Sequence, residues 1–137
     1  MTGTATGATT APVSRARTWA SRIITALFAL FMTFDGVIHV VKPAPVVDSF
    51  KELGIPFGAS LPVGVIELAC LALYLVPRTS VLGAILLTGY LGGAIAIQLR
   101  AAQVPFNIAF PAILGVLMWL ALWLRERRLQ GLLPVMR

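Results

Sequence analysis

Three ionisable side chains inside apolar sequence have the types and spacing of an acid/base site. Asp35 and His39 are four residues apart, and on a helix that spacing brings two side chains into contact. Glu67 lies in the next apolar stretch of the chain. Carboxyl and imidazole groups can exchange protons with a bound molecule, and a bilayer tolerates them only where they are paired, hydrated or used. We therefore treat Asp35, His39 and Glu67 as candidate catalytic acid/base residues.

Four apolar stretches carry these residues, at roughly 19–41, 61–76, 80–99 and 108–124. A helix needs about 20 residues to cross ~30 Å of hydrocarbon. The composition agrees, because 58% of the residues are apolar, 12% are charged and the mean hydropathy is +0.91. The sequence therefore predicts an all-α polytopic membrane protein, an up-and-down four-helix bundle over 15–128. We expect a disordered tail at 1–14, an external loop at 42–60 and a short cytoplasmic tail at 129–137.

Basic residues predict the orientation of these spans. An even number of spans places both chain ends on one side, which then carries eight arginines against three basic residues opposite. The first group comprises Arg15, Arg17, Arg22, Arg78, Arg125, Arg127, Arg128 and Arg137, and the second comprises Lys42, Lys51 and Arg100. Because Lys and Arg accumulate on the cytoplasmic side, we expect both termini in the cytoplasm. The charge of +6 then reflects topology, and no nucleic-acid partner is predicted.

Residue counting places the acidic groups at a common depth. Asp35 lies six residues before the external end of the first span, and Glu67 six residues after the external start of the second. Each carboxyl is therefore about 9 Å below the same surface, at 1.5 Å per residue. The sequence thus predicts an externally facing polar pocket. Its candidate ligand-binding residues are Arg100, Gln98, Asn107 and Tyr90.

This polar cluster has two other interpretations. In the first, it is a structural network that locks the four helices in register, with Asp35 or Glu67 paired to Arg100. In the second, it is part of a path for protons or ions.

The longest loop contains a short amphipathic pattern. Pro43 and Pro45 end the first helix, and apolar residues then recur at helical spacing until Gly54 and Pro56. A short interfacial helix over the external mouth fits this pattern, and a linker turn lying on lipid headgroups fits it equally well.

The third span is rich in small residues. Gly89 and Gly93 form a G-x-x-x-G pair that would let a neighbouring backbone come close. We favour packing inside the bundle over dimerisation, because a four-helix protein must first assemble itself. A homo-oligomer through Gly89 and Gly93 is the alternative.

The sequence contains few motifs that would indicate a cofactor. One His and two carboxylates could form a facial set for iron or zinc, but such sites usually contain a second His, so no metal site is predicted. Cys70 is the sole cysteine, which leaves no intramolecular disulfide. No nucleotide or haem motif is present in the sequence. A quinone is one candidate ligand, since quinone sites have no reliable sequence signature.

Several short motifs together resemble the DoxX-like family of small bacterial four-helix membrane proteins. They comprise Phe34–Asp35–Gly36 with His39, Phe50 to Pro56, Gly64–Val65–Ile66–Glu67–Leu68, Pro77–Arg78 with Leu82–Gly83–Ala84, and Gly92 to Arg100. The resemblance implies the fold and an association with membrane redox partners, because the family is named after a subunit linked to thiosulfate:quinone oxidoreduction. Many relatives end the third span in His-x-Arg, where this chain has Gln98–Leu99–Arg100. A metal or proton-shuttle role is therefore not carried over to Gln98, whereas Arg100 could still bind an anionic or carbonyl oxygen.

We accordingly expect a protein of the bacterial inner membrane that binds a small lipophilic or quinone-like molecule as an accessory component of a redox or stress-response system. One alternative is an autonomous membrane enzyme, either a proton-transferring isomerase or a quinone-linked oxidoreductase. There, Asp35 or Glu67 would be the acid/base, His39 its partner, and Arg100 would stabilise negative charge. A purely structural assembly protein, acting through the Gly-rich helix, is the other alternative.

Overall fold

The computed structural model describes residues 14–132, and these are almost entirely helical, with no strand among them. The helices are α1 (Arg15–Val41), α2 (Ala44–Glu52), the 3-10 turn η1 (Phe57–Ala59), α3 (Ser60–Leu75), α4 (Ser80–Arg100), α5 (Pro105–Arg125) and α6 (Arg127–Leu132). The disordered tail expected at 1–14 lies outside the described residues except for Ser14, and so does most of the tail expected at 129–137.

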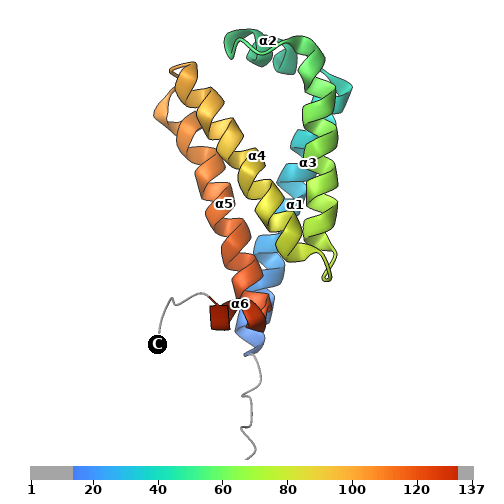
Figure 1. Ribbon diagram of the computed structural model, residues 1–137, viewed down its shortest axis with the longest axis vertical. Coiled ribbons are helices and arrows are strands. Elements are labelled where there is room, and N and C mark those ends of the chain that lie inside the picture. The colour runs from blue at the N-terminus through green and yellow to red at the C-terminus, as the bar shows by residue number, and fades with distance from the viewer. Residues whose placement is uncertain (1–13, 133–137) are drawn as a thin grey trace, which may run out of the picture.

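Four segments are long and apolar enough to cross a membrane: Arg15–Val41, Phe57–Leu75, Ser80–Arg100 and Pro105–Arg125. They run up and down in chain order (Figure 1). Large apolar side chains such as Leu30 and Val116 stay mostly exposed on the outside of the bundle, as lipid-facing residues do. The predicted fold class, an all-α four-helix membrane bundle, is confirmed.

The helix ends follow from local capping chemistry. The Ser14 hydroxyl accepts a hydrogen bond from the Arg17 backbone N–H over 3.3 Å and caps the start of α1. Lys42 ends α1 in the left-handed region, with φ of 61°, and Pro43 prevents the helix from continuing. Pro105 occupies the first turn of α5, where its missing N–H costs nothing.

The helices form a ring in which α1 packs on α3 and α5, and α4 packs on the same two helices. The tightest core lies towards the end of the bundle where α6 is found. There the fully buried Tyr74 hydroxyl donates to the Met118 carbonyl over 2.9 Å, and the Ser21 hydroxyl donates to the Ala121 carbonyl over 2.8 Å. At the opposite end the α4–α5 pair leans away from α1 and α3 (Figure 1).

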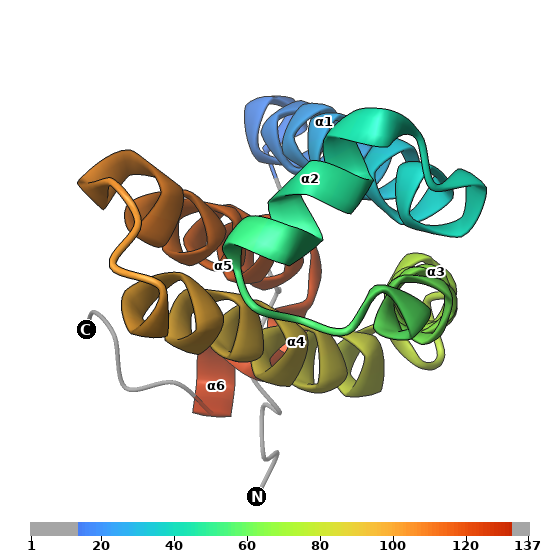
Figure 2. The ribbon, with the colours of Figure 1, turned by 90° about the horizontal axis from the view of Figure 1, so that it is seen from above.

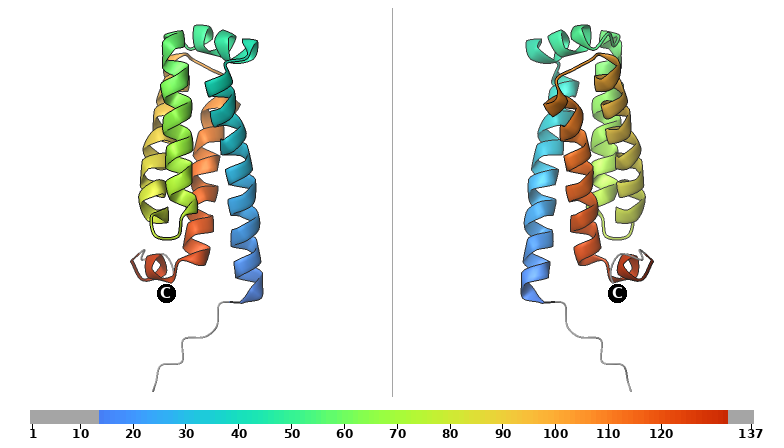
Figure 3. Two further views of the ribbon diagram at one scale, coloured as in Figure 1. Left: turned by 90° about the vertical axis from the view of Figure 1, so that its right-hand side faces the viewer. Right: turned by 90° about the vertical axis from the view of Figure 1, so that its left-hand side faces the viewer.

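Helix α2 lies across that wider end of the bundle (Figures 2 and 3). Its residues Val46 and Phe50 are only 5% and 4% exposed, so its apolar face is turned towards the bundle. Of the two interpretations of the 42–60 loop, the short helix over the mouth is therefore correct. The linker turn is not.

The glycines of α4 do not pack as expected. A Cβ atom added at Gly89 or Gly93 would meet nothing within 4 Å. Our expectation that this pair brings two helices together inside the chain is therefore wrong, because the helices diverge at this level. The close approach on α4 occurs instead at Gly83, where a Cβ atom would collide with the Tyr74 backbone.

Candidate functional site

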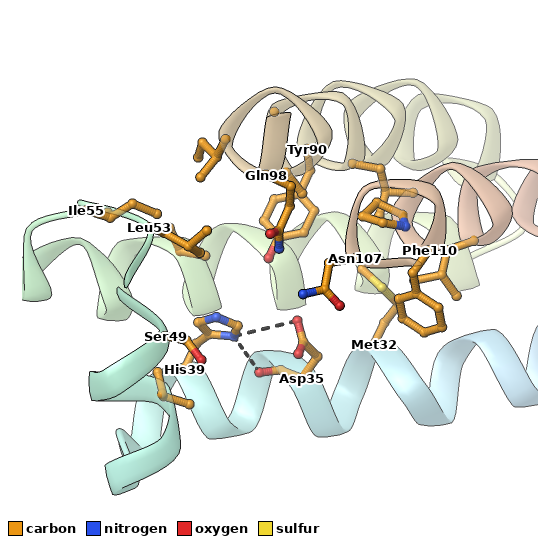
Figure 4. Close-up of a pocket in the computed structure, with 18 of the residues that line it drawn as sticks. Met32, Asp35, His39, Ser49, Leu53, Ile55, Tyr90, Gln98, Asn107 and Phe110 are labelled. Atoms are coloured by element: carbon orange, nitrogen blue, oxygen red, sulfur yellow. Dashed lines mark hydrogen bonds and ion pairs between the residues drawn. The ribbon is translucent and has the colours of Figure 1, made fainter. Parts of the chain in front are cut away.

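A cavity of about 550 Å³ lies between the diverging halves of the four helices, with residues of α2 in its lining. Most of its lining side chains are apolar or aromatic. The polar lining residues are Asp35, His39, Ser49, Tyr90, Gln98 and Asn107. Figure 4 shows Asp35, Gln98 and Asn107 projecting into this space from α1, α4 and α5.

Asp35 and His39 are joined through the backbone as well as through their side chains. The His39 Nδ1 atom lies 2.7 Å from the Asp35 carbonyl oxygen and 3.6 Å from the Asp35 carboxylate Oδ2 (Figure 4). A carbonyl oxygen can only accept, so Nδ1 carries the proton and donates it. The ring orientation is thereby set, and Nε2 is left as the nitrogen that can gain or lose a proton.

Glu67 is the most deeply placed member of the cluster and is fully buried on α3. Its Oε2 accepts a hydrogen bond of 2.7 Å from the Tyr90 hydroxyl and lies 4.0 Å from His39 Nδ1. Its Oε1 is buried without a hydrogen-bond partner among the described residues. Glu67 does not itself line the cavity, so it lies behind the wall that Asp35, His39 and Tyr90 form.

Two glycines explain why these side chains meet. A Cβ atom at Gly64 would lie 2.7 Å from the Gly36 carbonyl oxygen and 2.9 Å from the His39 Cβ. Gly36 follows Asp35 directly, and Gly64 lies nearly one turn before Glu67. Helices α1 and α3 can therefore touch at this level, which brings Glu67 beside Asp35. We did not single out this packing role from the sequence, although a glycine within one helical turn of each acidic residue is a usable signal.

Gln98 and Asn107 both line the cavity, and the ligand-binding role expected of them stays a prediction. The Gln98 Oε1 atom is buried without a hydrogen-bond partner among the described residues. The Asn107 amide Nδ2 donates to Gln103 Oε1 over 3.3 Å. These two residues therefore differ, since Gln98 retains an unsatisfied acceptor and Asn107 has already used one donor.

Arg100 lies outside the cavity lining and apart from the acidic cluster. Its Nη2 donates a 2.7 Å hydrogen bond to the Leu53 carbonyl, at the C-terminal end of α2, and the residue does not line the cavity. As the last residue of α4, Arg100 sits above the cavity mouth, where its long side chain reaches an otherwise unpaired helix-end carbonyl. The structure does not bring Arg100 together with Asp35 and Glu67. Its ligand-binding role stays a prediction.

The sequence profile of the DoxX-like family matches residues 23–121. That range contains Asp35, His39, Glu67 and the four candidate ligand-binding residues. The chain belongs to the DoxX-like family. Comparison of this DoxX-like protein with curated proteins and with solved structures finds no match.

The cluster of Asp35, His39 and Glu67 in this DoxX-like protein could also be interpreted as a metal site. Asp35, His39 and Glu67 each offer one ligand atom, and these atoms lie within 4.8 Å of one another. The His39 nitrogen that faces both carboxylates already donates its proton to the Asp35 carbonyl, so a metal ion would have to displace that proton. The donor set therefore fits a proton-bearing hydrogen-bond cluster better than a metal centre.

Proposed function

We propose that this DoxX-like protein binds a small lipophilic molecule in the cavity beneath α2, as an accessory component of a membrane redox or stress-response system. The observation that carries this proposal is the cavity of about 550 Å³, whose walls are mainly apolar with a few convergent polar groups. That combination is typical of small-molecule sites in proteins. A quinone-like molecule is the ligand class that the family association suggests.

Unsatisfied polar atoms argue against a purely structural network. A network that only locks helices in register satisfies its buried groups, because each buried polar atom left unpaired costs about 1–3 kcal/mol. Here Oε1 of Glu67 and Oε1 of Gln98 are both buried without a partner among the described residues. A bound molecule that donates hydrogen bonds would satisfy the Gln98 oxygen, because Gln98 lines the cavity.

A proton-transferring enzyme is the second candidate, and the ring orientation of His39 favours it. Because Nδ1 donates to the Asp35 carbonyl, Nε2 can take up and release a proton while the ring stays in place. Asp35 lines the cavity with a side chain that is 31% exposed, so it could act directly on a bound molecule as general acid or base. Turnover of a candidate substrate separates this function from binding alone.

The proposed location is the bacterial inner membrane with both termini in the cytoplasm. The arginine-rich helix ends support this orientation. Arg17 stacks over Trp123 at 5.5 Å and Arg22 over Trp19 at 5.9 Å from the ring centroids, as is typical of residues anchoring a helix end at an interface. Helix α2 lies at the opposite end (Figure 3) and would face outwards.

The proposed function is tested by asking which molecule copurifies with the protein. Mass spectrometry of an organic extract of the wild type should find a lipophilic molecule in stoichiometric amount. The Gly93→Leu variant should lose that molecule, because Gly93 lines the cavity and a side chain there occupies it. Gly92→Leu is the matched control, since Gly92 is equally free of neighbours but does not line the cavity. Equal retention in both variants would contradict the cavity as the binding site.

A further inference from the structure

We infer that the cavity selects a lipophilic cation, a protonated amine whose N–H groups point at Asp35 and Gln98. This inference rests on the proposed function, because it names the class of molecule that the same cavity takes. It differs from a quinone-like ligand in one decisive respect. A quinone head accepts hydrogen bonds, whereas a protonated amine donates them and carries a positive charge.

Acidic groups outnumber basic ones around the cavity, with two carboxyl groups against the single imidazole of His39, whose Nδ1 lies 3.6 Å from Asp35 Oδ2 and 4.0 Å from Glu67 Oε2. Asp35 lines it directly, and Glu67 lies directly behind Asp35, His39 and Tyr90. None of the described residues that line the cavity is a lysine or an arginine, and Arg100, the last residue of α4, donates to the Leu53 carbonyl. Buried carboxylates are costly unless a positive charge or a proton accompanies them. A bound cation supplies that charge.

Several hydrogen-bond donors around the cavity are already engaged. The Tyr90 hydroxyl donates to Glu67, the His39 Nδ1 donates to the Asp35 carbonyl, and the Asn107 amide donates to Gln103. These three N–H or O–H groups are engaged, while Asn107 keeps a second amide N–H and Gln98 carries two. The acceptors that the lining residues offer a ligand are the Asp35 carboxylate and Oε1 of Gln98, which has no partner among the described residues. A ligand that fits such a surface donates hydrogen bonds.

Aromatic rings make up much of the remaining wall. The aromatic lining residues are Phe31, Phe50, Tyr90, Phe106 and Phe110. Three of them are in ring contact, with centroids 5.1 Å apart for Phe31 and Phe110 and 5.7 Å apart for Phe106 and Phe110. Aromatic faces attract ammonium groups and also accept apolar skeletons. Acidic and aromatic walls together therefore suit an amine on an apolar body.

The test uses probes that share one naphthylmethyl skeleton and differ only in the head group. They are 1-naphthylmethylamine, the corresponding alcohol, 1-naphthylacetic acid and the trimethylammonium derivative. Binding is measured by calorimetry to the full chain in phosphatidylcholine nanodiscs, with empty nanodiscs as the partition control. The amine should bind at least about tenfold more tightly than the alcohol, because its hydrogen bonds to Asp35 are charge-assisted. The trimethylammonium probe should fall between them, since it has the charge without N–H donors.

Variants assign the preference to specific groups. Asp35→Asn should lower the affinity for the amine to that for the alcohol, whereas Asp35→Glu should keep most of the preference. Gly93→Leu should weaken the binding of the amine and the alcohol alike, and Gly92→Leu should weaken neither. Thermal unfolding of each variant establishes that it is folded before binding is measured.

The outcomes separate this inference from the proposed function. If the alcohol or the acid bound as tightly as the amine, or if Asp35→Asn left the amine affinity unchanged, the cationic head group would be wrong while the cavity remained a binding site. If Gly93→Leu left the binding of every probe unchanged, the cavity itself would not be the site and the proposed function would fail with it. Failure of all four probes to bind would overturn both.

Discussion

The Tyr90 hydroxyl donates a hydrogen bond to Glu67 Oε2 over 2.7 Å, and this contact joins α4 to α3 inside the bundle. Glu67 is fully buried, and its other carboxylate oxygen has no partner among the described residues. Tyr90 is therefore the main hydrogen-bond donor that this carboxyl group has. The chemistry of Glu67 depends on a residue from another helix.

Removing that donor should destabilise the protein. Tyr90→Phe keeps the ring but leaves the Glu67 carboxyl without its hydroxyl partner, which should lower the free energy of unfolding by about 1–3 kcal/mol. Thermal unfolding in detergent measures the loss. In the Glu67→Leu background, where no buried acceptor is left behind, Tyr90→Phe should cost much less. Equal losses in the two backgrounds would show that the hydrogen bond is not what stabilises this contact.

Alanine substitutions should distinguish the two kinds of glycine. Gly64→Ala places a Cβ atom 2.7 Å from the Gly36 carbonyl oxygen, so we expect overpacking to cost about 1–3 kcal/mol of stability. Gly89→Ala meets nothing within 4 Å and should be neutral or slightly stabilising. Thermal unfolding of the two variants compares them directly. A stable Gly64→Ala protein would mean that α1 and α3 are not held in backbone contact.

Thiol labelling tests the orientation. In a Cys70→Ala background, a cysteine at the exposed position Asp48 on α2 should react with a membrane-impermeant maleimide added to intact cells. A cysteine at Arg78, in the exposed turn between α3 and α4, should react only after the membrane is opened. The reverse pattern would place the termini outside, contrary to the arginine distribution.

Arg100 should act on the mobility of α2 rather than on the ligand directly. Arg100→Met removes the hydrogen bond to the Leu53 carbonyl, so hydrogen exchange of the backbone amides in α2 should become faster. Arg78→Met, which also removes an exposed basic residue but lies in the turn between α3 and α4, is the control and should leave exchange in α2 unchanged. Weaker ligand binding with unchanged exchange would instead support the direct ligand contact expected from the sequence.

The fold could be predicted from the sequence because each membrane-spanning helix is recognisable from its own residues, without knowledge of its neighbours. Long apolar runs show where the spans are, and the prolines show where they stop. The helices extend beyond the apolar runs, for example from Pro105 where we expected about 108, because a helix ends at its cap and not at its last apolar residue.

The candidate site was less accessible to this reasoning. Counting residues at 1.5 Å each was enough to place Asp35 and Glu67 at one depth. The direction of a long side chain was not predictable, so Arg100 was expected in the cluster and lies on the Leu53 carbonyl instead. The glycines of α4 were misassigned for a related reason. A small residue can lie at a helix contact or beside an open space, depending on the distance between the helices. A short sequence motif such as G-x-x-x-G does not specify that distance.

The contact between Gly36 and Gly64 makes two sides of the cavity differ in how well they tolerate larger side chains. The α1–α3 side tolerates them poorly, and the α4 side tolerates them well. At Gly64 the spacing between α1 and α3 leaves no room for a side chain. A substitution that moved Asp35 away from Glu67 would therefore also disturb the packing of these two helices. Across the cavity, Gly89 and Gly93 have open space around them. Substitutions on α4, whether natural or engineered, can therefore change the size of the cavity while Asp35 and Glu67 stay in place. Related chains could keep one head-group chemistry and still accept molecules of different bulk.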